Sequence, residues 1–307
     1  MFRSFSIQRI LLISVFLFWF SSCKKEDESL PADEIRTNCR QGVSPVKKVL
    51  FIGIDGCRTD AFLSAHSPGI DSVLVHAYFN GYCDRGPNTV SAPGWSTLLH
   101  GVFPAKHGVT SNDFPPTNYA QWPDIFPYLR QWNAALSLAT VSHWDNFLRI
   151  TTEEDYALPV NTDAEVRDQA IYLLNECTPD MLLLHFDDVD AAGHDDGFSP
   201  SVGSYMQAIR QTGIYIADIM QVVEAREQQY GEEWLVWIVT DHGGTGTGHG
   251  NQDNIPETRY VFLAGRLPGK PHTLLPSATN ADVLPTTMHY FGADSLIPSG
   301  TDGIVLF

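Results

Sequence analysis

The sequence predicts an α/β fold: a three-layer sandwich in which a mostly parallel central sheet carries helices on both faces. Two observations predict it. Short apolar runs alternate along the chain with longer helical patterns, as in parallel strands joined by crossover helices. The apolar runs are also continuous, which is typical of strands whose two faces are both covered. The chain has 307 residues and 43% apolar residues, enough for one large domain or two small ones.

The N-terminal segment differs in kind from the rest of the chain. Arg3 and Arg9 precede a nearly unbroken apolar run at residues 10–20. That run is too short to span a bilayer comfortably and is typical of a signal peptide, although a membrane anchor helix is the alternative. We therefore expect residues 1–22 to be a signal peptide. Two serines then lead into Cys23, an arrangement that resembles a bacterial lipoprotein box with Cys23 as the lipidated first mature residue.

Residues 23–46 are rich in charges and predict a lipoprotein tether with little structure. The expected location is therefore an exported lipoprotein of the outer membrane, on its periplasmic face or at the cell surface, with the membrane as a partner through the lipid. Four further cysteines allow two disulfides in three pairings. Of these we expect Cys57–Cys83, because both residues flank loops of the site described below.

Residues 47–307 are expected to form the folded domain. Strands are predicted at residues 49–54, 136–141, 181–186, 234–240 and 260–264. Helices are predicted at residues 92–100, 126–132, 162–176, 204–229 and 281–291. The aromatic-rich stretch 113–161 is the best candidate for a substrate-facing insertion. Ligands in such folds gather outside the carboxyl ends of the strands, so the residues that follow the strands are the candidates for a site.

Seven side chains suggest a two-metal centre with a nucleophile: Asp55, Ser91, Asp190, His194, Asp241, His242 and His249. All but the serine are oxygen or nitrogen donors that suit zinc, and the lack of cysteine among them argues against a structural thiolate site. Asp55 ends the first predicted strand, an acidic run at 187–196 follows the third, and Asp241 with His242 ends the fourth. Three strand ends are therefore predicted to direct these groups into one crevice.

Simpler explanations compete with the metal centre. Asp241 and His242 are neighbours on a strand, so both reach one metal only if the chain turns, which the two following glycines permit. A polar turn is the alternative. The acidic run could be a solvated loop, and within it Asp187 and Asp188 compete with Asp190 for the ligand position.

Ser91 stands at the start of a predicted helix, with Pro93 in its first turn. Its hydroxyl is therefore expected to cap the helix. The same position suits a nucleophile that accepts phosphate, because helix N-termini attract anions. Thr89 is the alternative nucleophile.

The ordered motifs GIDGCRTD, TVSAPGWSTLLHGVFPAKHGV, DVDAAGH, VTDHGG and GHG resemble the alkaline phosphatase superfamily, most closely its type I phosphodiesterase/nucleotide pyrophosphatase branch. The resemblance runs from about Lys47 to the C-terminus and implies an alkaline-phosphatase-like sandwich. It implies two zinc ions, one held by Asp55, Asp241, His242 and the Ser91 oxygen, and the other by Asp190, His194 and His249. Asn112 matches an asparagine that donates to a phosphoryl oxygen, although a turn residue is its simpler explanation.

The chain departs from that family pattern in three ways. Ser91 stands where threonine is the usual nucleophile. The short gap from His242 to His249 leaves no room for an elaborate cap. Residues 91–93 overlap the start of the sulfatase signature, but Trp95 stands where that signature needs arginine and no matching Lys-His pair is present. A sulfatase is therefore the enzyme alternative.

The resemblance implies hydrolysis of a small-molecule phosphate ester through a phosphoserine intermediate, with two zinc ions or other divalent metals. A diester is expected, because a monoester carries more charge and the chain offers little to bind it: Arg85 and Lys106 match no phosphate-gripping position of the family, and Arg58 could serve the start of a helix instead. A phosphomonoesterase and an inactive anion-binding surface lipoprotein are the alternatives. The formal net charge of −17 argues against a nucleic acid polymer as partner. The sequence predicts no oligomeric state.

Overall fold

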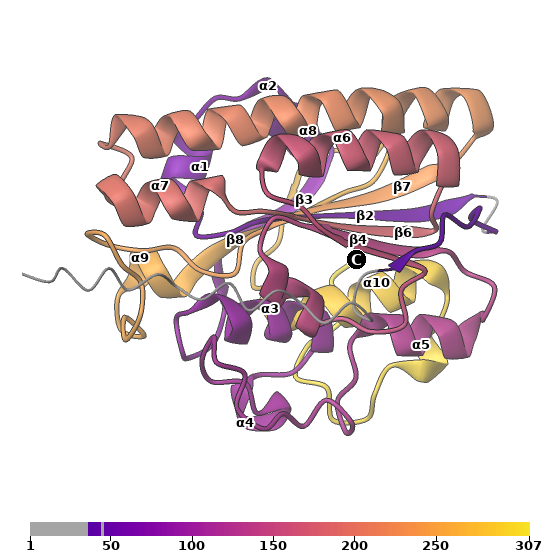
Figure 1. The fold of residues 1–307 in the computed structure, drawn as a ribbon, viewed down its shortest axis with the longest axis horizontal. Coiled ribbons are helices and arrows are strands. Elements are labelled where there is room, and N and C mark those ends of the chain that lie inside the picture. The colour runs from indigo at the N-terminus through magenta and orange to yellow at the C-terminus, as the bar shows by residue number, and fades with distance from the viewer. Residues whose placement is uncertain (1–35, 44–45) are drawn as a thin grey trace, which may run out of the picture.

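The structure, a computed structural model, describes residues 36–43 and 46–307, in which one nine-stranded sheet separates two helical layers (Figure 1). The upper layer holds α1 (Thr59–Ser64), α2 (Pro68–Leu74), α6 (Asp163–Tyr172), α7 (Asp188–Asp196) and α8 (Gly203–Tyr230). The lower layer holds α3 (Ser91–His100), α4 (Pro104–His107), α5 (Ile125–Trp132) and α10 (Val283–Phe291). The predicted three-layer α/β class is confirmed.

Five neighbouring strands form the parallel centre of the sheet: β5 (Tyr156–Pro159), β4 (Leu138–Ser142), β6 (Met181–Phe186), β2 (Lys47–Ile54) and β7 (Glu233–Val239). The flanking strands are β8 (Tyr260–Arg266), antiparallel to β7, β3 (Ala77–Asp84), antiparallel to β8, β9 (Thr273–Leu274) and β1 (Arg36–Thr37). The sequence predicted β2, β4, β6, β7 and β8. It missed β3, which contains an Asn-Gly pair and a bulge, and β5, which is short and ends in proline.

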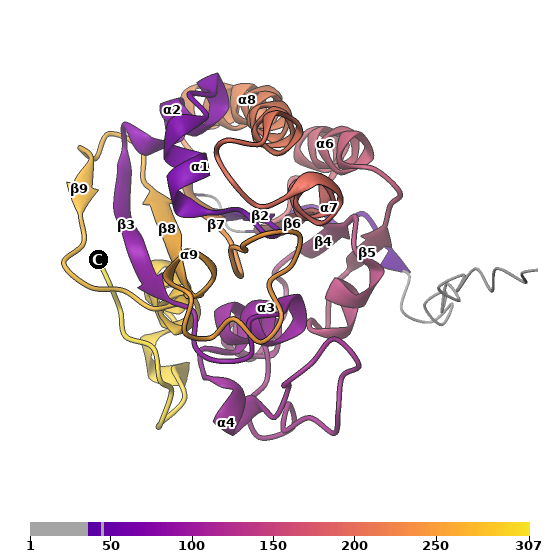
Figure 2. The ribbon, with the colours of Figure 1, turned by 90° about the vertical axis from the view of Figure 1, so that its left-hand side faces the viewer.

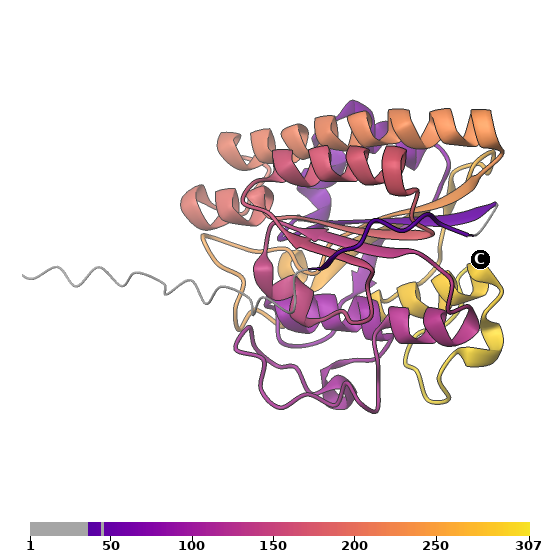
Figure 3. The ribbon, with the colours of Figure 1, turned by 45° about the vertical axis from the view of Figure 1, so that its right-hand side comes forward.

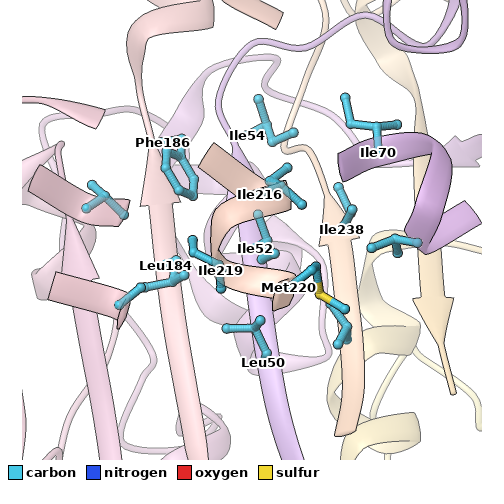
Figure 4. Close-up of a cluster of buried hydrophobic side chains, with 14 of the residues drawn as sticks. Leu50, Ile52, Ile54, Ile70, Leu184, Phe186, Ile216, Ile219, Met220 and Ile238 are labelled. Atoms are coloured by element: carbon cyan, nitrogen blue, oxygen red, sulfur yellow. The ribbon is translucent and has the colours of Figure 1, made fainter. Parts of the chain in front are cut away.

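The strand β2 shows why its apolar run is continuous. Leu50, Ile52 and Ile54 pack into the cluster beneath α8, where Figure 4 shows them facing Ile216 and its neighbours. Val49 and Phe51 belong to a second cluster on the opposite face, against the lower helices. Burying each large aliphatic side chain contributes about 1.5–3 kcal/mol. Both faces of the central strand are therefore covered, as the sequence predicts.

The sheet topology brings the candidate site to one edge. β2 pairs in parallel with both β6 and β7, with Ile54 opposite Phe186 and Gly53 opposite Val239. The residues that follow these strands therefore emerge side by side. Figure 2 faces this edge, with α7 above and α3 below the strand ends.

The segment 36–43 is folded onto the domain, so the expectation of little structure throughout the tether is wrong there. β1 pairs antiparallel with β5, and Arg40 Nη1 lies 2.8 Å from Asp155 Oδ1. Figure 3 shows this indigo segment beside the sheet. Residues 1–35 and 44–45 lie outside the described residues, and so do the signal peptide and Cys23. Among the helices of the described residues, none has the length and apolar character needed to cross a membrane.

The cysteines pair differently from the expectation. Cys39 forms a disulfide with Cys177, which joins the segment 36–43 to the end of the helical region after α6. Cys57 and Cys83 are both buried and free. They cannot meet because Cys57 belongs to the apolar cluster above the sheet and Cys83 to the cluster below it. The predicted Cys57–Cys83 pair is therefore wrong.

Candidate active site

Ser91 is the first residue of α3, and its hydroxyl does not cap the helix as the sequence led us to expect. The N-cap residue is Val90, whose apolar side chain makes no capping hydrogen bond. The Asn112 Oδ1 atom instead accepts the Ala92 N–H at 2.9 Å. This external cap releases the Ser91 hydroxyl for other contacts.

The first predicted ligand set is assembled around Ser91. His242 Nε2 lies 3.3 Å from Ser91 Oγ, 3.4 Å from Asp55 Oδ1 and 3.2 Å from Asp241 Oδ2. The His242 Nδ1–H donates to the Gly243 carbonyl at 2.8 Å, so the Nε2 lone pair faces this group. All four side chains are buried. The structure therefore brings together the four residues of the predicted set.

The two glycines after His242 are needed for space rather than for a left-handed turn. Neither Gly243 nor Gly244 has a positive φ. A Cβ atom on Gly243 would lie 2.0 Å from the Glu257 carbonyl oxygen, and one on Gly244 would lie 2.5 Å from the Phe198 ring. The glycines thus let the loop pass close to its neighbours while Asp241 and His242 reach the same group.

The second predicted ligand set also converges. Asp190 and His194 lie one turn apart on α7, so the acidic run is a helix and not a solvated loop. His194 Nε2 lies 3.2 Å from Asp190 Oδ2 and 3.0 Å from His249 Nε2. The Nδ1 atoms of both rings are bonded to backbone carbonyls, those of Thr247 and Thr89. Two ring nitrogens facing each other at this distance need a proton or a cation between them.

The alternatives raised by the sequence have other roles. Thr89 Oγ1 donates to the His249 carbonyl at 2.6 Å and accepts the Gln252 N–H at 3.1 Å, so it holds the loop and does not face Ser91. Asp188 Oδ1 lies 3.6 Å from His143 Nδ1, away from the two histidines of the second set. Asp187 lies beside Asp55 rather than with His194.

Burial and like charge raise the pKa of several carboxyl groups in this cluster. Burial, reinforced by the Asp55 carboxylate, raises the pKa of Asp190 to about 7 and that of Asp187 to about 6. The same two causes raise the pKa of Asp241 well above its usual value. Burial acts in the same direction on Asp55, but hydrogen bonding to His185 and the nearby His242 ring outweigh it and lower the pKa.

These groups fit a divalent cation. Asp190 Oδ1 and Asp241 Oδ2 are buried and have no hydrogen-bond partner among the described residues. Carboxylate oxygens and imidazole Nε2 atoms are donors that zinc accepts, and the bonded Nδ1 atoms fix the ring orientations. Asp190, His194 and His249 have ligand atoms within 4.8 Å of one another, and so do Asp55, Asp190 and His242. Asp190 thus borders both groups.

Sequence reasoning missed three residues that support the site. Trp95 Nε1 and His185 Nε2 each lie 3.0 Å from Asp55 Oδ2. Asp163, the first residue of α6, accepts the backbone N–H groups of Asp187 and Asp188 at 2.8 and 3.2 Å and so caps the start of α7. Only His185 carried a sequence signal, as a polar residue in an otherwise apolar strand.

Comparison with known proteins decides the family. The model of the type I phosphodiesterase/nucleotide pyrophosphatase family matches residues 49–124 and 114–258, more than half of the chain. The chain belongs to this family. Its fold is that of the alkaline phosphatase superfamily. Sequence comparison with curated proteins gives no match.

Solved structures share the fold of this phosphodiesterase family member at low identity. Murine ectonucleotide pyrophosphatase/phosphodiesterase 5, an inactive form in complex with AMP, is 13% identical with a TM-score of 0.63, over 80% of this chain and 95% of that one. The human protein of the same name is 12% identical with a TM-score of 0.63, over 84% of this chain and 97% of that one. A 2-O GAG sulfatase is 15% identical with a TM-score of 0.62, over 85% and 73%.

The basic residues near the site of this family member are engaged by protein groups. Arg85 is fully buried and donates to the carbonyls of Asp241 and Val90, at 2.5 and 3.0 Å, which ties the strand end to the start of α3. Arg58 forms an ion pair with Asp60. Lys106 forms an ion pair with Asp302 and donates to the Gly300 carbonyl, so it is held by the C-terminal segment.

The aromatic stretch 113–161 serves the core as well as the surface. Tyr119 stacks on His100 at 4.0 Å, and Phe126 is fully buried. Phe114 is only partly buried, follows Asn112 closely and carries the Arg149 guanidinium over its ring at 4.4 Å. The expected substrate-facing role therefore remains a prediction for the part of the stretch near Asn112.

Proposed function

We propose that this protein hydrolyses phosphodiesters, with Ser91 as the nucleophile and two zinc ions held by the two ligand sets. The observation that carries the proposal is the position of Ser91 Oγ, 3.3 Å from His242 Nε2 and 3.4 Å from Asp55 Oδ1, with its hydroxyl released from helix capping. A serine used only as a cap would bond the backbone of its own helix.

Asp55, Asp241 and His242 would hold one zinc ion together with the Ser91 oxygen, and Asp190, His194 and His249 would hold the other. When bound, zinc supplies Lewis acidity, which lowers the pKa of a hydroxyl or water and offsets charge on phosphoryl oxygens. The unpartnered oxygens of Asp190 and Asp241 support this assignment.

The reaction we propose has two in-line displacements. Ser91 gives up its hydroxyl proton, its Oγ bonds to phosphorus, and the first alcohol leaves with a proton from solvent. Water then attacks the phosphoseryl group, its proton returns to solvent, and Ser91 Oγ leaves and is reprotonated. Two inversions give net retention at phosphorus.

Two features would stabilise the charge on the phosphoryl group. Asn112 uses its Oδ1 on the Ala92 N–H, which leaves its side-chain amide N–H groups to donate to a phosphoryl oxygen. Ser91 also stands at the N-terminus of α3, where the helix dipole favours an anion.

A diester is the preferred substrate class because Arg58, Arg85 and Lys106 are all engaged by protein partners. A monoester dianion usually needs an additional cationic group, whereas a diester carries a single negative charge. We therefore expect kcat/KM for a diester to exceed that for the matched monoester at least about tenfold, or about 1.4 kcal/mol.

Sulfate-ester hydrolysis is the second candidate, because residues 91–93 overlap the sulfatase signature and the fold resembles that of sulfatases. Trp95 argues against it. Its indole fills the position where that signature needs arginine, is fully buried and donates to Asp55. No guanidinium stands there to bind a sulfate group.

One substrate panel tests the proposal. The protein beginning after Cys23 is assayed on matched nitrophenyl diesters, monoesters, phosphonates and sulfates, beside Ser91→Ala and the control Ser96→Ala. Ser96 lies on the same helix, where its hydroxyl bonds the Ala92 carbonyl and Tyr119. We expect a diester preference that Ser91→Ala abolishes and Ser96→Ala keeps. A monoester preference of similar size, or faster sulfate hydrolysis, would refute the assignment.

We further propose export and lipidation at Cys23, followed by a tether that reaches to the described segment. The disulfide Cys39–Cys177 supports an oxidising compartment. Cys23→Ser should leave the precursor uncleaved or release the protein from membranes. Normal processing with unchanged membrane attachment would count against lipidation and favour an uncleaved membrane helix.

A further inference from the structure

The two carboxylate oxygens of Asp55 face different surroundings. Oδ1 faces the reacting group, 3.4 Å from both Ser91 Oγ and His242 Nε2. Oδ2 faces inward, where the Trp95 indole N–H donates at 3.0 Å and the His185 imidazole lies at 3.0 Å through Nε2. One oxygen is thus bonded to two rings and the other is directed to the site.

We propose that Trp95 and His185 are positioning residues that fix the Asp55 carboxylate so that Oδ1 is presented to a zinc ion beside Ser91. The inference rests on the proposed function and extends it to residues that touch neither substrate nor metal. Trp95 is contributed by α3, one turn after Ser91, and His185 by β6. Trp95 and His185 together form a clamp on the Asp55 carboxylate. This clamp links α3, the end of β2 and the neighbouring strand β6.

Packing holds both donors in place. Asp55, Trp95 and His185 are each at most 1% exposed. The Trp95 and His185 rings meet edge to face at 5.1 Å, and Phe147 contacts both, at 5.4 and 4.9 Å. Gly53 provides room for the indole, since a Cβ atom there would lie 2.6 Å from the Trp95 ring. In such an environment neither donor can turn away without disturbing its neighbours.

The hydrogen bonds assign the proton on His185. Its Nδ1 atom is buried and has no hydrogen-bond partner among the described residues. A proton on Nδ1 would bury an unbonded donor and leave Nε2 facing the Asp55 oxygen as a second acceptor, and both are costly. A proton on Nε2 satisfies Asp55 and leaves only the Nδ1 lone pair unpaired. His185 therefore acts as a donor to Asp55.

The clamp has a measurable consequence for metal binding. Groups that orient a metal ligand change metal affinity by about 10–100-fold when they are removed. Removing either ring donor would let the Asp55 carboxylate rotate and leave Oδ2 with a single partner. The loss should fall on the zinc ion beside Ser91, because the ligand set Asp190, His194 and His249 makes no hydrogen bond to these rings in the described structure.

Zinc titration against a competing chelator tests the inference in the protein that begins after Cys23. The variants are His185→Leu, His185→Gln and Trp95→Phe. The matched controls are Trp237→Phe, which removes a buried indole donor to Thr287, and His100→Leu, which removes a buried imidazole bonded to backbone carbonyls. Thermal unfolding of each metal-free protein reports on folding.

We expect one of the two zinc affinities to fall about 10–100-fold in His185→Leu and Trp95→Phe, while the other stays unchanged. His185→Gln should recover most of the loss, because the glutamine amide can donate from a similar position. The two controls should keep both affinities. If His185→Leu does not fold, His185→Gln and Trp95→Phe still give the answer.

Three results would overturn the inference alone. The first is an unchanged zinc affinity in Trp95→Phe, and the second is a loss of zinc affinity in Trp237→Phe equal to that in Trp95→Phe. The third is a loss of zinc affinity in His185→Gln of at least the tenfold expected of His185→Leu, which would make His185 a direct ligand. A wild-type protein that binds fewer than two zinc ions yet is fully active would instead overturn the proposed function, and the inference with it.

Discussion

Single atoms decide the chemistry of the site. In His242, His194 and His249, Nδ1 is bonded to a backbone carbonyl and Nε2 faces the acidic groups. This arrangement would orient each ring for a metal ion before the ion binds. The convergence of these residues was predictable from the sequence, because histidines and aspartates cluster after predicted strands. The sequence wrongly predicts that the Ser91 hydroxyl caps α3. The contact that replaces it, from the Ala92 N–H to Asn112 Oδ1, depends on tertiary structure and leaves no local pattern.

His249→Ala tests whether His249 is a metal ligand. The variant should lose one zinc equivalent and at least about a hundredfold in kcat/KM, or about 2.7 kcal/mol in transition-state stabilisation, because it removes one of three donors of that set. Elemental analysis after dialysis and a diester assay measure both. His272→Ala is the control, since His272 is exposed and bonds the Leu74 carbonyl at the surface. Full zinc content in His249→Ala would remove His249 from the ligand set.

At the scale of elements, the five strongest apolar runs were predictable as strands, because burial on both faces leaves a continuous pattern. α7 was not, because its sequence, DVDAAGHDD, is dominated by aspartate and glycine, which have low helix propensity. The helix forms because a buried carboxylate far away in the chain caps it: Asp163 accepts the N–H groups of Asp187 and Asp188. No local pattern could reveal that contact.

Asp163→Ala tests this cap. Loss of an N-cap acceptor should lower the free energy of unfolding by about 0.5–2 kcal/mol. Because α7 carries Asp190 and His194, zinc affinity at that set should fall as well. Chemical denaturation and chelator competition measure the two effects. The control Asp168→Ala, an exposed change on α6, should alter neither the stability nor the zinc affinity. If Asp163→Ala is destabilised but keeps both zinc affinities, the cap has a purely structural role.

At the scale of the whole molecule, the segment 36–43 is joined to the domain by the disulfide Cys39–Cys177 and by Asp155, which bonds Arg40 and Arg130 at 2.8 and 2.6 Å. Local composition predicted little structure here, because long-range partners leave no sequence pattern. Any lipid-anchored tether would therefore end at residue 36 or before, close to the edge of the sheet formed by β1 and β5.

Asp155→Asn tests this junction through pH. Burial acts to raise the Asp155 pKa, but hydrogen bonds from Arg130 and Arg40 outweigh it and lower the pKa in the folded state. A lowered pKa means that the carboxylate stabilises the fold above its unfolded-state value, about 3.9, and that this stability is lost as pH falls through the lower folded value. Denaturation at pH 6 should show Asp155→Asn to be less stable than wild type, with a difference that shrinks below pH 4. A pH-independent difference would contradict the charge-based account.

The proposed reaction requires Ser91 to form a covalent bond to phosphorus. The most direct measurement is mass spectrometry of the protein quenched during turnover of a nitrophenyl diester, followed by mapping of the modified peptide. We expect a phosphoryl ester adduct on Ser91 that is absent from Ser91→Ala and present in Ser96→Ala. An adduct on Thr89, or continued turnover of Ser91→Ala at the wild-type rate, would contradict it.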